Sequence, residues 1–303
     1  MHGVLVTYRR PQAIATMLDC LAAQDRPLDS LVVIDNDPAE SARAAVAALA
    51  TEGETTAPSV RYIAAGANIG PAGGIALGMR EVLGGAADDD WVVSLDDDDP
   101  PTWPEVFGRL VGLGGRLRVD DPRVGAVGMV GGRFSAPRAR AVRVPDDELR
   151  GAVPVDWIAG NQFPVYSVAA LRDVGVFDER LFFGFEELDF GLRLRAAGYG
   201  VYVDGDLWRR ARESAGRLGL DPSPSRGLDD AGWRRYYSLR NMIYILRKQG
   251  AGGGAVRLAA RGLAKPVANV PRGPRQAWRH LALNARAIAD AYRGRMGLTV
   301  EPG

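Results

Sequence analysis

The sequence has one cysteine, two histidines and no long apolar run. Cys20 has no second cysteine to pair with, so an internal disulfide is excluded, and its neighbours Met17 and Leu21 favour packing on a helix face. No stretch of about 18 uncharged apolar residues is present, which excludes a conventional membrane-spanning helix. Residues 3–7 have the pattern of a strand directly after Met1, without the basic and apolar regions of a signal peptide. We therefore expect a cytoplasmic protein.

Charge is unevenly distributed along the chain, although the net charge is only +1. Residues 1–205 contain 19 basic and 30 acidic residues, whereas residues 206–303 contain 19 basic and 7 acidic ones. An acidic body argues against nucleic acid as the main ligand. The basic C-terminal part is suited to contact an anionic membrane, an anionic acceptor or the acidic body itself.

The first 130 residues alternate short β-branched segments with segments of helical apolar periodicity. This alternation predicts an α/β fold with a mixed, mainly parallel sheet and flanking helices. We expect strands at residues 3–7, 30–35, 59–63, 91–96 and 124–130, and helices at 11–23, 38–50, 71–83 and 102–114.

The remainder of the chain is less regular. Glycines and prolines break residues 131–185 into short strands and loops, which we expect to form one wall of a cleft. A helix at 186–197 and a strand at 200–204 follow, and residues 209–230, rich in Arg, Gly, Pro and Ser, are interpreted as a mobile loop. A helical appendage is expected at residues 231–249 and 253–296.

Four aspartates, Asp96 to Asp99, end the apolar segment Trp91 to Leu95. Adjacent carboxylates repel one another unless solvent or a cation neutralises them, and oxygen ligands suit Mg²⁺ or Mn²⁺. In an extended segment Asp96 and Asp98 point to one side and Asp97 to the other. Taken alone, the run fits a solvated acidic turn equally well. Its position at the end of a buried strand favours a metal site.

Two further segments allow both a structural and a functional interpretation. Residues 68–74 combine Asn68 with several glycines before a helix, as in a phosphate-binding loop, but they lack the lysine of a P-loop. Glu186, Glu187 and Asp189 stand at a helix start, where the helix dipole favours negative charge whether or not they have a function. The preceding aromatic residues could desolvate one of these carboxylates and make it a better base.

Together these segments resemble the inverting family 2 glycosyltransferases of the GT-A fold, in particular the bacterial galactofuranosyl- and rhamnosyltransferase-like group. The similarity covers nearly the whole chain, and its order and spacing are more specific than any single piece. It is carried by Val6-Thr7-Tyr8-Arg9-Arg10-Pro11, Val33-Ile34-Asp35-Asn36, Asn68-Ile69-Gly70, Trp91 to Asp98, Gly160-Asn161, Glu186-Glu187-Leu188-Asp189, Tyr236-Tyr237-x-x-Arg240-Asn241 and Ile288 to Arg295.

The resemblance implies a nucleotide-sugar-binding half at 1–130, an acceptor and catalytic half at 131–208, and a mobile loop with a basic helical region at 209–303. It implies a single displacement in which Glu187 is the general base, and Mg²⁺ or Mn²⁺ as cofactor. The other implied site residues are Thr7, Arg10, Asp35, Asn68, Gly70 and Asp97 for the nucleotide, Asp96 and Asp98 for the metal, and Glu186, Asp189, Trp157 and Asn161 for the acceptor.

The chain departs from the family pattern at one position. The family commonly has a histidine metal ligand, often just after a tryptophan, but Trp208 is followed here by Arg209 and Arg210. A guanidinium group cannot ligate a metal, although it can neutralise a diphosphate. We hypothesise that Arg209 or Arg210 contacts the diphosphate, or that the site binds metal weakly.

The implied donor is UDP-galactofuranose or dTDP-rhamnose, and the implied acceptor is a glycan, a lipid-linked molecule or a small molecule in cell-wall or glycoconjugate biosynthesis. The basic helices at 253–296 would suit peripheral contact with the inner face of the plasma membrane. A soluble acceptor is an equal alternative. Two other functions stay open, a nucleotidyltransferase and a nucleotide-sugar-binding protein without turnover, and release of nucleoside diphosphate would separate the latter from an enzyme.

Overall fold

The computed structural model describes residues 1–51, 58–219, 232–268 and 273–302. Its centre is an eight-stranded sheet in the order β3-β2-β1-β4-β10-β5-β11-β8. Strands β10 and β8 run antiparallel to their neighbours, and the remaining pairs are parallel. The strands are β1 (His2–Thr7), β2 (Ser30–Asp35), β3 (Ser59–Ala64), β4 (Trp91–Asp96), β5 (Val124–Gly128), β8 (Ala152–Pro154), β10 (Val165–Ser167) and β11 (Gly200–Asp204).

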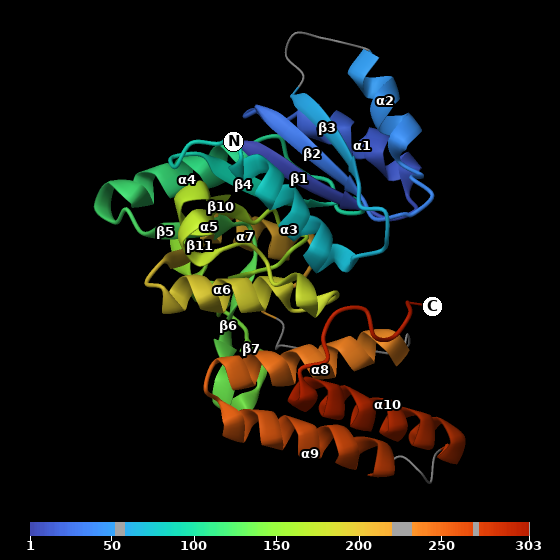
Figure 1. Cartoon of the computed structure of the whole chain (residues 1–303). Coiled ribbons are helices and arrows are strands. Elements are labelled where there is room, and N and C mark those ends of the chain that lie inside the picture. Colours follow the sequence, from blue (N-terminus) through green and yellow to red (C-terminus); the bar gives the residue numbers. More distant parts are fainter. Residues whose placement is uncertain (52–57, 220–231, 269–272, 303) are drawn as a thin grey trace.

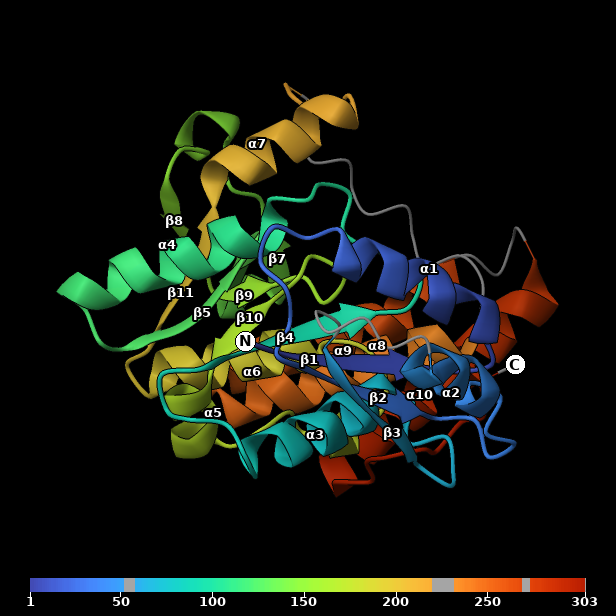
Figure 2. The same cartoon turned by 90° about the horizontal axis from the view of Figure 1, so that it is seen from above.

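Helices cover both faces of this sheet (Figure 2), and the central strands are therefore apolar almost throughout. One face packs against α3 (Gly70–Leu83), α5 (Val168–Val174) and α6 (Glu186–Ala196), and the other against α1 (Pro11–Ala22) and α4 (Val106–Asp120). Helix α2 (Arg43–Thr51) packs beside α1. In β4 the residues from Trp91 to Leu95 are buried and Asp96 is exposed, so a rigid core strand delivers the aspartates to the surface.

The middle of the chain adds a small three-stranded sheet in the order β7-β6-β9. It consists of β6 (Gly131–Ser135), β7 (Arg140–Val142) and β9 (Trp157–Ile158), and the 3-10 turns η1 (Ala136–Arg138), η2 (Asp146–Glu148) and η3 (Glu179–Leu181) lie in the same region of the sequence. Strand β9 packs against α6, and this contact links the small sheet to the helix that carries Glu186 and Glu187.

The last three helices, α8 (Gly232–Lys248), α9 (Gly252–Ala268) and α10 (Pro274–Arg293), pack on one another and form a layer beyond α6 (Figure 1). Leu188 of α6 packs into a cluster with Met242, Ile243 and Leu246 of α8. Within the described residues, no helix is long and apolar enough to cross a membrane.

The predicted α/β class and mainly parallel sheet are confirmed, and the structure corrects one expected loop. Residues 205–214 form α7 (Gly205–Ser214), where a loop was expected from residue 209. Asp204 caps this helix by accepting a hydrogen bond from the Leu207 amide at 2.9 Å, and Leu207 and Trp208 are buried. Residues 220–230 of the expected loop lie outside the described residues.

Candidate active site

A cavity of about 470 Å³ opens at the carboxyl ends of β1 and β4, beside the loops that follow β2 and β3. Ligands of open α/β sheets bind at such an edge. Its walls come from these loops, from the segment before α6, from the start of α8 and from the C-terminal segment. The lining residues are Val6, Thr7, Tyr8, Arg10, Asn36, Asn68, Gly70, Pro71, Leu95, Asp96, Asp97, Asp98, Phe182, Phe183, Trp233, Arg234 and Pro302.

The aspartate run lies on this cavity with its members in different environments. Asp97 is buried and accepts hydrogen bonds from Oγ1 of Thr7 at 2.7 Å and from Nη1 of Arg10 at 3.1 Å. The same Arg10 nitrogen donates to Oδ2 of Asp98 at 2.5 Å. Asp96 and Asp98 are exposed. Asp97 thus connects the end of β1 to the end of β4, while the carboxylates of Asp96 and Asp98 are exposed to solvent.

The three carboxylates are close enough to share a cation, because one oxygen from each of Asp96, Asp97 and Asp98 lies within 4.8 Å of the others. Partial desolvation, followed by the negative charges of Asp98 and Asp97, raises the pKa of Asp96 to about 7. This mutual repulsion is relieved when a divalent cation binds, and the all-oxygen ligand set suits Mg²⁺ or Mn²⁺. The residues present therefore fit a metal.

The loop after β3 is shaped by Asn68 and Gly70. Oδ1 of Asn68 accepts a hydrogen bond from the Gly70 amide at 3.0 Å. Gly70 has a φ of +72°, and a Cβ at this position would collide with the carbonyl oxygen of Phe182. The loop that lines the cavity is therefore packed directly on the segment that leads into α6.

At the end of β2 lie Asp35, predicted to contact the nucleotide, and its neighbour Asn36. Asp35 is fully buried, and its oxygens accept hydrogen bonds from the amides of Asp37 and Ala42 and from the Tyr62 hydroxyl. It does not line the cavity. The next residue, Asn36, lines the cavity instead; its Nδ2 donates to the Gly70 carbonyl at 2.9 Å, and its Oδ1 has no partner among the described residues.

Glu186 and Glu187 begin α6 and are both desolvated. Burial raises the pKa of Glu187 to about 7. Oε1 of Glu187 lies against Gly160, where a Cβ would collide with it. Burial, and then the charges of Glu187 and Asp96, raise the pKa of Glu186 well above its ordinary value. Oε2 of Glu186 has no hydrogen-bond partner among the described residues. Gly160 is followed by Asn161, whose side chain bonds to Asp99, so the start of α6 lies near the aspartate run.

Two further residues expected at the acceptor lie on the segment around β9. Nδ2 of Asn161 donates to Oδ2 of Asp99 at 2.7 Å, which connects this segment to the aspartate run. Trp157 packs in the cluster that contains Leu188 of α6, and within the described part of the chain its Nε1 has no partner. Trp157 and Glu186 thus each have a buried polar atom without a partner among the described residues.

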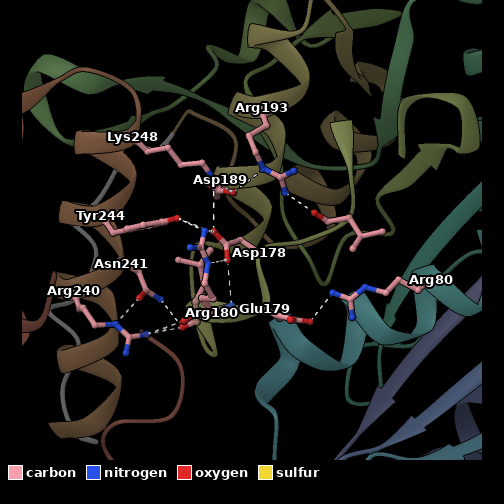
Figure 3. A network of polar contacts seen from close by, with 12 residues as sticks. Arg80, Asp178, Glu179, Arg180, Asp189, Arg193, Arg240, Asn241, Tyr244 and Lys248 are labelled. Atoms are coloured by element: carbon pink, nitrogen blue, oxygen red, sulfur yellow. Dashed lines mark hydrogen bonds and ion pairs between the residues drawn. The ribbon is translucent and has the colours of Figure 1, made fainter. Parts of the chain in front are cut away.

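Asp189 occupies a different place from the one expected. It is fully buried on α6 between Lys248 and Arg193 (Figure 3). Its oxygens accept hydrogen bonds from Nζ of Lys248 at 2.8 and 3.0 Å and from Nε of Arg193 at 2.9 Å. The bonds to Lys248 join α6 to α8. Because both oxygens of Asp189 are buried and already bonded to cations, they are not available to an acceptor.

The structure also places Arg209 and Arg210 elsewhere. Nε of Arg209 pairs with Glu213 at 3.1 Å on the same helix. Arg210 pairs with Glu105, and its guanidinium carbon lies 4.2 Å from the centre of the Trp103 ring. Neither arginine lines the cavity.

Residues far along the chain complete the cavity and were not predicted. Phe182 and Phe183 come from the segment before α6, Trp233 and Arg234 from the start of α8, and Pro302 from the C-terminal segment. The sequence marked Phe182 and Phe183 only as aromatic neighbours of a carboxylate, and it did not mark the others, because all of them reach the aspartates through tertiary packing.

Comparisons with known proteins agree with this architecture. Residues 4–113 match the family model described as glycosyl transferase family 2. The chain is 29% identical over 270 residues to galactofuranosyltransferase GlfT1 of Mycobacterium tuberculosis (strain ATCC 25618 / H37Rv), covering 82% of this chain and 83% of that protein. GlfT1 of Mycolicibacterium smegmatis is 29% identical over 265 residues, with the same coverage.

Two solved structures show a similar fold. Mannosyltransferase PcManGT from Pyrobaculum calidifontis, in complex with GDP-Man and Mn²⁺, gives a TM-score of 0.50 at 19% identity, covering 96% of this chain and 86% of that one. GalNAc-T7 with UDP, GalNAc and Mn²⁺ gives a TM-score of 0.53 at 11% identity, covering 81% of this chain and 47% of that one. Sequence, site and fold agree: the chain is a nucleotide-sugar glycosyltransferase of the GT-A fold, and its residues 4–113 match glycosyl transferase family 2.

Proposed function

We propose that the protein transfers a sugar from a nucleoside-diphosphate donor to an acceptor hydroxyl by a single displacement that inverts the anomeric configuration. The observation that carries this proposal is the carboxylate of Glu187, which lies against Gly160 and whose pKa burial raises to about 7. Such a carboxylate is a stronger base at neutral pH than an ordinary glutamate. The acceptor oxygen bonds to the anomeric carbon, the bond from that carbon to the diphosphate breaks, and Glu187 takes the hydroxyl proton.

The cavity at the end of β1 and β4 is the proposed donor site. Thr7, Arg10, Asn68 and Gly70 line it, as a nucleotide contact requires. Asn36 takes the place first expected for Asp35, since its unpartnered Oδ1 can accept a hydrogen bond from the nucleotide.

Asp96 and Asp98 are the proposed ligands of Mg²⁺ or Mn²⁺, and their exposure and mutual repulsion support this role. When bound, the cation would stabilise negative charge on the departing diphosphate. Asp97 would have a positioning role, because it holds the Thr7 hydroxyl and the Arg10 guanidinium at the rim of the site through hydrogen bonds.

The names of the sequence relatives favour a galactofuranosyl donor such as UDP-galactofuranose over a rhamnosyl one. Glu186, Trp157 and Asn161 are the proposed acceptor-side residues, supported by the free polar atoms of Glu186 and Trp157. A lipid-linked glycan acceptor would agree with the exposed basic surface of α9 and α10, which we propose contacts an anionic membrane.

A transfer assay with UDP-galactofuranose or dTDP-rhamnose, Mn²⁺ and a glycan acceptor tests the proposal. The release of nucleoside diphosphate measures the rate of transfer, and NMR spectroscopy of the product determines its anomeric configuration. Glu187→Gln should reduce transfer about 10²- to 10⁴-fold, because the base is lost, and should leave donor affinity unchanged. Glu213→Gln, which alters an exposed carboxylate on α7, is the matched control. Full activity of Glu187→Gln, or retention of configuration, would contradict the mechanism.

A further inference from the structure

The start of α8 brings an aromatic residue and a cation to the donor cavity. Trp233 and Arg234 line it together with Thr7 and Asp96, although they follow the aspartates by more than 130 residues. Trp233 packs edge-to-face on Phe183, with ring centres 4.7 Å apart, and on Tyr237 at 6.2 Å. These contacts fix the first turn of α8 against the segment that leads into α6.

Arg234 is held by aromatic faces and not by a carboxylate. Its guanidinium carbon lies 5.1 Å from the centre of the Trp233 ring and 5.6 Å from that of Phe183, and its side chain is exposed. Among the described residues it makes no ion pair, whereas Arg10, the other arginine of the cavity, is already shared by Asp97 and Asp98. Arg234 therefore presents a positive charge that is available to a ligand.

The charge balance of the cavity depends on Arg234. Its ionisable lining comprises three aspartates and two arginines, an excess of one negative charge. A bound divalent cation reverses this to one positive charge, which suits an anionic ligand. Without Arg234 the metal-loaded cavity would carry no net charge, so Arg234 supplies the excess positive charge that adds to the attraction of the cation for a nucleoside diphosphate.

We propose that Arg234, positioned by Trp233 and Phe183, binds the β-phosphate of the donor nucleoside diphosphate. The inference rests on the proposed function and deepens it, because it assigns to α8 the diphosphate contact first sought at Arg209 and Arg210. When the bond between the anomeric carbon and the β-phosphate oxygen breaks, the electron pair stays on that oxygen. The guanidinium group then stabilises the added negative charge through paired N–H donors.

The test compares nucleotides with one and two phosphates. Binding of UDP, UMP, dTDP and dTMP is measured calorimetrically in the presence of Mn²⁺ for the wild type, Arg234→Ala, Arg234→Lys and the control Arg209→Ala. Arg234→Ala should weaken UDP or dTDP binding about 10- to 100-fold, as expected for loss of a charge-assisted hydrogen bond. Its affinity for the monophosphates should stay near that of the wild type, Arg234→Lys should be intermediate, and Arg209→Ala should bind like the wild type.

The outcomes separate this inference from the function on which it rests. If the wild type binds diphosphates and Arg234→Ala binds them equally well, or loses both classes of nucleotide to the same degree, the assignment of Arg234 is wrong and the proposed function stands. An effect confined to the KM for the acceptor would also overturn it. If the wild type binds none of the four nucleotides, the proposed function itself fails.

Discussion

The ionisation of Glu187 should control how transfer depends on pH. Burial raises its pKa to about 7, whereas an ordinary glutamate is ionised well below this pH. Because the base must be deprotonated, the transfer rate at saturating donor and Mn²⁺ should fall about tenfold per pH unit below pH 7 and reach a plateau above it. Initial rates between about pH 5 and pH 9 measure this profile.

Glu187→Gln is the control for the pH profile, because its residual activity should lose this dependence. Donor affinity, measured at each pH, separates ionisation of the base from changes at the aspartates. A wild-type profile that is flat through pH 7, with unchanged donor affinity, would show that Glu187 is not the base.

At the scale of single residues, the sequence indicated which strand ends carry polar side chains but not which of two neighbours faces the ligand. The aspartate run was predictable, since a buried strand leads directly into it. Asp35 and Asn36 are adjacent in the sequence. The side chain of Asp35 points into the protein because it accepts hydrogen bonds from the amide of Ala42 and from the hydroxyl of Tyr62 on the next strand. These are tertiary contacts that neither residue type reveals.

At the scale of elements, α8 supports the segment before α6 through one buried amide. Nδ2 of Asn241 donates to the carbonyl oxygens of Leu181, Phe183 and Gly184 at distances from 2.9 to 3.0 Å (Figure 3 shows Asn241). The neighbouring Arg240 donates to the Leu181 carbonyl as well. The segment that ends at Glu186 is thus held by α8 in addition to its own backbone hydrogen bonds.

Asn241→Ala should lower the free energy of unfolding by about 3 kcal/mol, because the partly buried carbonyls of Phe183 and Gly184 lose their donor. Transfer should fall as well, since the same segment supplies Phe182 and Phe183 to the cavity. Urea unfolding measures the stability, and Gln276→Ala, at an exposed position of α10, serves as the control with a change below about 0.5 kcal/mol. Equal stabilities of the two variants would show that the amide does not support the segment.

The elements themselves were largely predictable where a periodic pattern was strong, as in β1, β4, α6 and α8. Helix α7 was missed because its arginines resemble a loop in composition, while its stability comes from the Asp204 cap and the burial of Leu207 and Trp208. The contribution of α8 to the cavity was missed for another reason. Helical periodicity predicts a helix but not the partner against which it packs.

At the scale of the whole molecule, the acidic part and the basic part of the chain lie in different layers. The sheet and its helices carry most of the acidic residues, while α9 and α10 contain one acidic residue, Asp290, which is buried. Their exposed cations are Arg257, Arg261, Lys265, Arg275, Arg279, Arg286 and Arg293. Apolar side chains are exposed among them, including Val256 at 61% and Trp278 at 61%. In Figure 1 these two helices form the layer farthest from the sheet.

An exposed surface of cations, valine and tryptophan is suited to an anionic bilayer interface, where each cation adds about 1 kcal/mol. The protein should therefore sediment with vesicles of phosphatidylglycerol and phosphatidylcholine at low salt, and less at high salt because screening weakens the attraction. Replacing Arg261, Arg275 and Arg279 by alanine should reduce binding about 100-fold.

The control replaces Arg26, Arg116 and Arg150, which are exposed on the body, and should bind like the wild type. Equal losses in the two triple variants would indicate attraction by total charge, and no binding at low salt would exclude the membrane contact and favour a soluble acceptor.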